Sequence, residues 1–189
     1  MKKIIAGLAA SLIMCSAGAQ TTFKADKFHS QLKFDITHTG VSTVSGAFTD
    51  FEATVTAAKA DFSDAVFQLT AKSASINTGI EPRDNHLKTD QFFDVATYPA
   101  LSYTSTSVNK ISEGRFTLNG NLTMHGVTKP VIMDLWYRGT ITNPMSKKEV
   151  SGFRATGKIN RSDFGIGTKF PGNSIGEEVI IIADGEFSK

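Results

Sequence analysis

Residues 30–39 read SQLKFDITHT, and this stretch decides the fold class. Leu32, Phe34 and Ile36 occupy every second position, and the residues between them are polar. Successive side chains of a β-strand point to opposite faces, so this alternation predicts a strand with one buried face. His38 continues the apolar face, and we expect it to be a hydrogen-bonded residue of the rim or the core. The first element of the fold is therefore predicted to be a half-buried strand.

The same period of two returns along most of the chain. The predicted inward faces are Phe51, Ala53, Val55 and Ala57; Phe67, Leu69 and Ala71; Leu101 and Tyr103; Phe116, Leu118, Leu122 and Met124; Val131, Met133, Leu135 and Tyr137; Phe153, Ala155, Gly157 and Ile159; and Val179, Ile181 and Ala183. Regular strands separated by turn signals are typical of a barrel or a sandwich. Several of these strands are long, which favours the tilted strands of a closed barrel. The sequence thus predicts an all-β fold of about eight antiparallel strands.

Small residues on the predicted inward faces leave two interpretations of the interior. Ala53, Ala57, Ala71, Ala155 and Gly157 are interspersed with large apolar residues. They can leave space inside an eight-stranded barrel, which is wide enough to hold one ligand. They can equally interdigitate with the large side chains in a sealed core. The pattern alone does not decide between the two.

Residues 78–99 interrupt the alternation with TGIEPRDNHLKTDQFFDVATYP. Pro82 fits a first helical position, so a short helix is predicted there. Asp90 is predicted to cap a second helical turn that carries Phe92 and Phe93. Pro99 then ends the insert. A helical insert in a barrel is expected to act as a lid or a plug.

Residues 1–19 are predicted to be a secretory signal peptide. Lys2 and Lys3 precede an apolar run too short to cross a bilayer, and small residues lead up to Ala19. Cleavage there leaves residues 20–189 as one domain. An uncleaved anchor and lipidation at Cys15 are the alternatives, the second disfavoured by the bulky Met14 before it.

Cleavage changes the charge and the cysteine content of the chain. The full sequence has 20 basic and 18 acidic residues, and losing Lys2 and Lys3 lowers the net charge from +2 to 0. A neutral domain gives no electrostatic reason to expect nucleic acid as a partner. Cys15 is the only cysteine, so the exported domain is expected to have neither a disulfide nor a thiolate metal site. No later apolar run is long enough for a stable membrane anchor.

Few residue patterns point to chemistry. The histidines of the domain, His29, His38, His86 and His125, do not fall at a metal-ligand spacing, so no metal site is predicted. No Gly-x-Ser-x-Gly nucleophile motif is present. Asp84 lies two residues before His86, which keeps a small hydrolase acting on an amphiphile as an alternative hypothesis.

Arg83 and the two phenylalanines of the insert each have two interpretations. Arg83 can be a solvated residue at a helix start, or its planar guanidinium can hold a polar head group at a cavity mouth. Phe92 and Phe93 can anchor the insert to the core or form the apolar wall that a lid adds to a tunnel.

Motifs spread over the whole domain resemble the YceI-like family of exported proteins. They are Asp26-x-x-His29-Ser30, Phe34-x-Ile36-x-His38, Gly46-x-Phe48, Arg83-Asp84-x-His86-Leu87, Phe92-Phe93-Asp94, Tyr98-Pro99, Thr123-x-His125-Gly126-Val127-Thr128 and Arg161-x-Asp163-Phe164-Gly165. The resemblance implies a lipocalin-like eight-stranded antiparallel barrel with a helical insert, exported to the periplasm. It also implies a long isoprenoid or a similar amphiphilic lipid as the ligand, with no enzymatic activity and no cofactor.

The resemblance and the inward faces together predict a lipid-binding site. The predicted tunnel lining is Phe34, Ile36, Phe51, Phe67, Leu101, Phe116, Met133, Leu135 and Phe153, with Phe92 and Phe93 as lid contacts and Arg83 and His86 near the head group. We therefore expect a periplasmic protein that binds, stores or transports a polyisoprenoid without catalysis. A sealed barrel that acts as an interaction module is a further alternative. The sequence leaves the oligomeric state open, a homodimer included.

Overall fold

The computed structural model describes residues 19–189, so residues 1–18 of the predicted signal peptide lie outside the described part. The strands are β1 Thr21–Ala25, β2 Gln31–His38, β3 Ser42–Phe48, β4 Phe51–Ala57, β5 Val66–Lys72, β6 Ile76–Asn77, β7 Ala100–Ser112, β8 Arg115–Met124, β9 Val127–Thr142, β10 Glu149–Asn160 and β11 Ile175–Ser188. The helices are α1 Glu81–Leu87 and the short 3₁₀ helices η1 Ser73–Ser75 and η2 Arg161–Phe164. Within these residues no helix is long and apolar enough to cross a bilayer.

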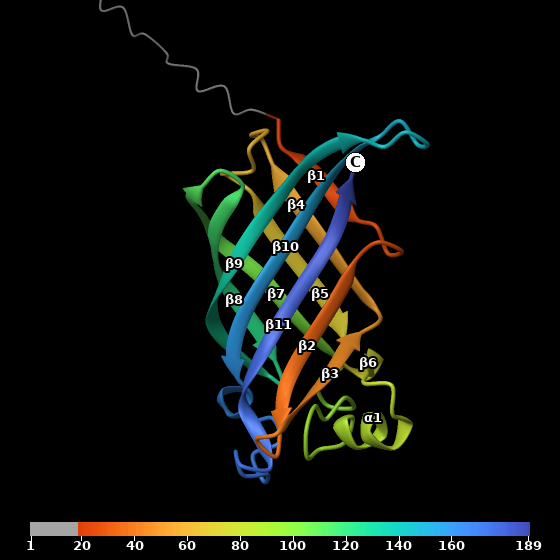
Figure 1. The fold of residues 1–189 in the computed structure, drawn as a ribbon, viewed down its shortest axis with the longest axis vertical. Helices are drawn as coiled ribbons and strands as arrows, with labels where there is room; N and C mark the ends of the chain where they lie inside the picture. Colours follow the sequence, from red (N-terminus) through yellow and green to blue (C-terminus); the bar gives the residue numbers. More distant parts are fainter. Residues whose placement is uncertain (1–18) are drawn as a thin grey trace, which may run out of the picture.

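The strands form one antiparallel sheet that closes on itself where β1 pairs with β11 (Figure 1). β1 and β2 pair with successive parts of β11, so they share one position in the barrel. β3 pairs with β2 and β4 pairs with β1, so these two share the next position. β5 and β6 share a third, separated only by η1. Together with β7 to β11 this makes eight positions, and the predicted eight-stranded antiparallel barrel is confirmed.

The period-two pattern places apolar side chains inside the barrel. On β9, Val131, Met133 and Leu135 are buried, whereas Ile132 between them is 65% exposed. The pleat of the strand forces this alternation, and burial of the inward side chains stabilises the fold. The predicted inward face of this strand is therefore confirmed.

The insert lies between β6 and β7 and contains the predicted helix, with Pro82 in its first turn. The prediction that Asp90 caps a second helical turn is wrong, because residues 88–93 form turns instead. Thr89 takes the capping role: the backbone N–H of Gln91 donates to its hydroxyl at 3.4 Å, and that of Phe92 donates to its carbonyl at 3.0 Å. A tight turn, not a second helix, positions the two phenylalanines.

Candidate functional site

The barrel encloses a cavity of about 430 Å³. This volume lies within the range of roughly 300–1,000 Å³ that is common for small-molecule sites. Its walls are inward apolar side chains from both sides of the barrel, including Leu32, Leu69, Leu122 and Ile181. The structure therefore has the open interior and not the sealed core.

All but one of the predicted site residues line this cavity. They are Phe34, Ile36, Phe51, Phe67, Arg83, His86, Phe92, Phe93, Leu101, Met133, Leu135 and Phe153. Phe116 is the exception: its side chain is buried but does not line the cavity. Alternation shows that Phe116 faces inward, but not at which height of the barrel its ring lies.

Half-buried side chains line the cavity on more than one side of the barrel. Phe34, Ile36 and Ile181 of β2 and β11, and Phe51 and Leu69 of β4 and β5, face inward and yet are only half-buried. Leu118 of β8 and Leu135 of β9 also line the cavity but are each only 2% exposed. Inward side chains that remain accessible in a closed barrel must border open space.

Two segments cover one end of the cavity. Figure 1 places α1 and the segment between β10 and β11 at the same end of the barrel. The ring of Phe92 stacks on that of Phe170 at a centroid distance of 4.9 Å, and His86 meets Phe92 edge-on at 5.0 Å. Phe93 meets Phe48 of β3 edge-on at 5.6 Å. Phe92 and Phe93 thus join the insert to the second covering segment and to the barrel wall.

Arg161 holds the second covering segment, residues 165–176, in place. Its side chain is 3% exposed, and it donates hydrogen bonds to the carbonyl oxygens of Ile166, Gly167, Phe170, Ile175 and Gly176. Nη2 also donates to Glu177 Oε1 at 2.7 Å. The planar fork of a guanidinium can satisfy many acceptors at once, and buried carbonyls need such partners. In the sequence, Arg161 stands out only as an arginine that opens a glycine-rich stretch.

The charged residues of α1 bind the start of the insert. The buried carboxylate of Asp84 accepts hydrogen bonds from the backbone N–H of Thr78 at 2.8 Å and from its hydroxyl. Arg83 Nε donates to Thr78 Oγ1 at 2.7 Å, and Nη2 donates to the Thr78 carbonyl at 3.0 Å. His86 Nε2 lies 3.3 Å from Gln91 Oε1. Within residues 19–189, Asp84 and His86 form no hydrogen bond with each other, so the geometry does not favour the hydrolase hypothesis.

Tyr103 places one hydroxyl among the apolar side chains of the cavity wall. That hydroxyl donates to the Leu118 carbonyl at 3.4 Å. Burial disfavours the phenolate and raises the pKa of Tyr103 to about 12. The wall therefore carries no charge at this position at physiological pH.

Comparison with known proteins agrees with this geometry. A sequence model of the YceI-like domain matches residues 23–187. The chain belongs to the YceI-like family. A UPF0312 protein of Serratia proteamaculans is 36% identical over 193 residues, which cover 100% of both chains.

Solved structures share the YceI-like barrel. A mutant of the Campylobacter jejuni YCEI protein superposes with a TM-score of 0.75 at 32% identity, covering 82% of this chain and 90% of that one. A polyisoprenoid binding domain from Saccharophagus degradans superposes with a TM-score of 0.65, covering 88% of this chain and 97% of that one. The latter is 17% identical, so this second likeness shows the fold alone.

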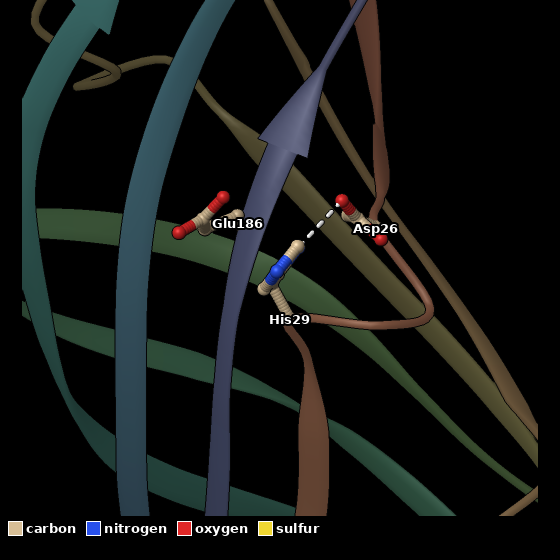
Figure 2. A group of neighbouring side chains, drawn as sticks. All are labelled: Asp26, His29 and Glu186. Atoms are coloured by element: carbon tan, nitrogen blue, oxygen red, sulfur yellow. Dashed lines mark hydrogen bonds and ion pairs between the residues drawn. The ribbon is translucent and has the colours of Figure 1, made fainter. Parts of the chain in front are cut away.

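A polar cluster lies on the wall of this YceI-like barrel, where β1 and β2 meet β11 (Figure 2). Asp26, His29 and Glu186 each offer one ligand atom, and these atoms lie within 4.8 Å of one another. Asp26 Oδ2 lies 2.9 Å from His29 Nδ1, and Asp26 Oδ1 accepts the backbone N–H of Phe28 at 2.8 Å. Sequence spacing could not reveal the group, because Glu186 is distant in the chain. The ion pair accounts for the Asp26–His29 geometry.

We expect the titration of His29 to depend on Asp26. The Asp26 carboxylate raises the pKa of His29 above 6.5, and His29 in turn lowers the pKa of Asp26 below 3.8. The stabilisation from His29 is fully present below 6.5 and is lost as pH rises through the raised pKa; that from Asp26 is present above 3.8 and is lost as pH falls through the lowered pKa. In NMR titrations, Asp26→Asn should return the His29 pKa to its ordinary range, and Glu186→Gln should lower it less. An unchanged His29 pKa in Asp26→Asn would contradict the pairing.

Proposed function

We propose that the protein binds a long-chain apolar lipid inside the barrel and releases it unchanged, with a polyisoprenoid as the class of ligand. The observation that carries the proposal is the cavity of about 430 Å³ with its apolar walls. The similar structure from Saccharophagus degradans supports the choice of class, because that protein is a polyisoprenoid binding domain. Binding and release require no catalytic group.

The energetics suit an apolar chain in such a cavity. Burial of each CH₂ contributes roughly 0.8 kcal/mol, and a prenyl chain carries many such groups. The free energy of non-covalent binding does not exceed about 18–21 kcal/mol in favour of the complex. The entropic cost of ordering the chain and the lid must therefore offset part of the gain from burial. The apolar walls supply affinity, and the few polar groups near the cavity supply orientation.

The polar end of the ligand belongs at the covered end of the cavity. Thr78, Arg83 and His86 border the cavity there, on the insert. Thr78 already binds Nε and Nη2 of Arg83, which leaves Nη1 of this guanidinium for a head group. In this orientation the tail points toward the opposite end of the barrel.

We further propose that the protein acts in the periplasm as a carrier or store. The predicted signal peptide of residues 1–19 supports export. A lipid with a long prenyl chain is nearly insoluble in water, so moving it between two membranes requires a protein that shields the chain.

Filling the cavity tests the proposal directly. Ala183 lines the cavity on β11, so Ala183→Trp should occupy the space of the ligand and lower prenol affinity at least about tenfold, which corresponds to roughly 1.4 kcal/mol. Delipidated protein would be titrated with farnesol and geranylgeraniol, read by displacement of a fluorescent fatty-acid probe. Ala60→Trp is the matched control, because Ala60 is exposed in the loop between β4 and β5. Equal affinities of parent and Ala183→Trp would overturn the assignment of the cavity.

A further inference from the structure

The cavity ends inside the barrel, before the end of β9 and short of the start of β1. On β9, Leu135 lines the cavity but Tyr137 does not. On β1, Ala25 lines it but Phe23 does not. Inward residues that do not line the cavity include Phe23, Val55, Phe116 and Ser151, which are buried, and Tyr137, which is partly buried. The barrel is therefore a cup, and side chains fill its closed end.

Aromatic rings form the floor of this cup. Phe153 lies at the centre: its ring centroid is 4.9 Å from that of Phe62, 5.3 Å from those of Phe67 and Tyr137, and 5.6 Å from that of Phe187. We call these five residues the aromatic stop. Phe67, Phe153 and Phe187 face the cavity, whereas Phe62 and Tyr137 lie behind them. The tail of a sufficiently long ligand chain would contact this layer with its terminal end.

Phe62 closes the layer from outside the strands. It belongs to the loop between β4 and β5 and has a φ of 57°, in the left-handed region that a bulky side chain rarely adopts. The ring is nevertheless 5% exposed and lies 5.5 Å from Phe23 and 5.1 Å from Tyr137. Such a backbone conformation persists only where the surrounding packing holds it. The packing of the Phe62 ring into the barrel end stabilises this backbone conformation.

We propose that the aromatic stop sets the longest chain that the cavity accepts, with Phe153 as the residue that ends it. The inference rests on the proposed lipid binding and adds a length limit to it. Affinity should rise with each isoprene unit until the chain reaches Phe153. A further unit then has to remain at the covered end, where it disturbs the packing of Phe92 on Phe170.

The test is a chain-length series of all-trans prenols, from farnesol to solanesol, titrated into delipidated full-length protein. In the parent, affinity should stop rising at one chain length. In Phe153→Ala this limit should move to longer chains by at least one isoprene unit, and the first prenol beyond the parent limit should bind about tenfold more tightly than to the parent. Phe153→Leu keeps most of the packing, and it should move the limit in the same direction by less. Circular dichroism checks that each variant folds.

Phe51→Ala is the matched control. It removes the same ring from the cavity wall, but Phe51 does not belong to the aromatic stop. This variant should weaken the binding of all prenols without moving the limit. The inference is overturned if the parent binds prenols and either shows no limit, or keeps its limit in both Phe153 variants, or shifts it equally in Phe51→Ala. If the parent binds no prenol of any length, the proposed function itself fails.

Discussion

Arg161→Ala is expected to lower the free energy of unfolding by about 3–5 kcal/mol, the range for removing one partner of a buried charged network. The side chain is 3% exposed and donates to five carbonyl oxygens and to Glu177. Its loss leaves the carbonyl oxygens of this part-buried network without their donor, and each buried acceptor left unpaired is destabilising. Residues 165–176 should therefore detach from the barrel end. Urea unfolding of the two proteins measures the difference.

Two further variants separate this network from charge alone. Arg161→Lys keeps the charge but loses the planar fork, so it should recover only part of the stability. Arg154→Ala is the matched control, because Arg154 is 41% exposed and pairs on the surface with Asp184. It should cost less than about 1 kcal/mol. A loss in Arg161→Ala no larger than in Arg154→Ala would refute the role of Arg161.

Replacing both Phe92 and Phe93 by alanine is expected to speed lipid release at least about tenfold, a change of roughly 1.4 kcal/mol. Phe92 is 5% exposed and stacks on Phe170, and Phe93 packs on Phe48. Full burial of a phenylalanine side chain contributes roughly 1.5–3 kcal/mol, so buried Phe92 stabilises the closed lid by more than half-buried Phe93 does. Without them the insert should separate from residues 165–176 and open the covered end. Stopped-flow transfer of a fluorescent prenyl analogue to vesicles measures the release rate.

Arg83→Ala should have a smaller effect on the same rate, because Arg83 contributes to head-group binding and not to the apolar closure. Phe28→Ala is the control for loss of a phenyl ring, since Phe28 is 94% exposed and lies outside the cavity. This control should release lipid at the parent rate. Faster release from Arg83→Ala than from the double variant would mean that the head group, not the lid, retains the ligand.

Alternation was sufficient to predict the strands and most of the side chains that face the interior. Side chains at every second position of a strand must share a face, so Phe34, Met133 and Leu135 could be assigned to the interior from the sequence. Pro82 located the helix for a similarly local reason, since its fixed φ suits a first turn. The family resemblance supplied the closed topology and the ligand class, which no local pattern contains.

The remaining features depend on contacts between distant segments. Alternation gives the face of a residue but not whether its side chain reaches the cavity, so it did not separate Phe116 from the residues that line it. Thr89 and Asp90 are both good capping residues, and only the tertiary packing of the insert selected Thr89. Arg161 donates to backbone carbonyl oxygens, and because every residue has one, the sequence does not show which of them it binds. Glu186 lies near Asp26 only because β11 pairs with β1 where the barrel closes.

Residues 30–39 have a second role that the structure shows and the sequence alone did not. They contain β2, whose inward side chains Phe34 and Ile36 line the cavity. The same alternation that builds the strand therefore also builds the wall against which a lipid would lie.

Native mass spectrometry of the protein purified from the periplasm of its native host, the compartment in which we propose that it acts, tests the central claim most directly. The account predicts a complex heavier than the polypeptide, from which collisional activation releases a lipid with a repeating isoprene mass. Purification from the native compartment matters, because overexpression elsewhere can load a different lipid. A mass equal to that of the polypeptide alone, together with no binding of added prenols, would contradict the account.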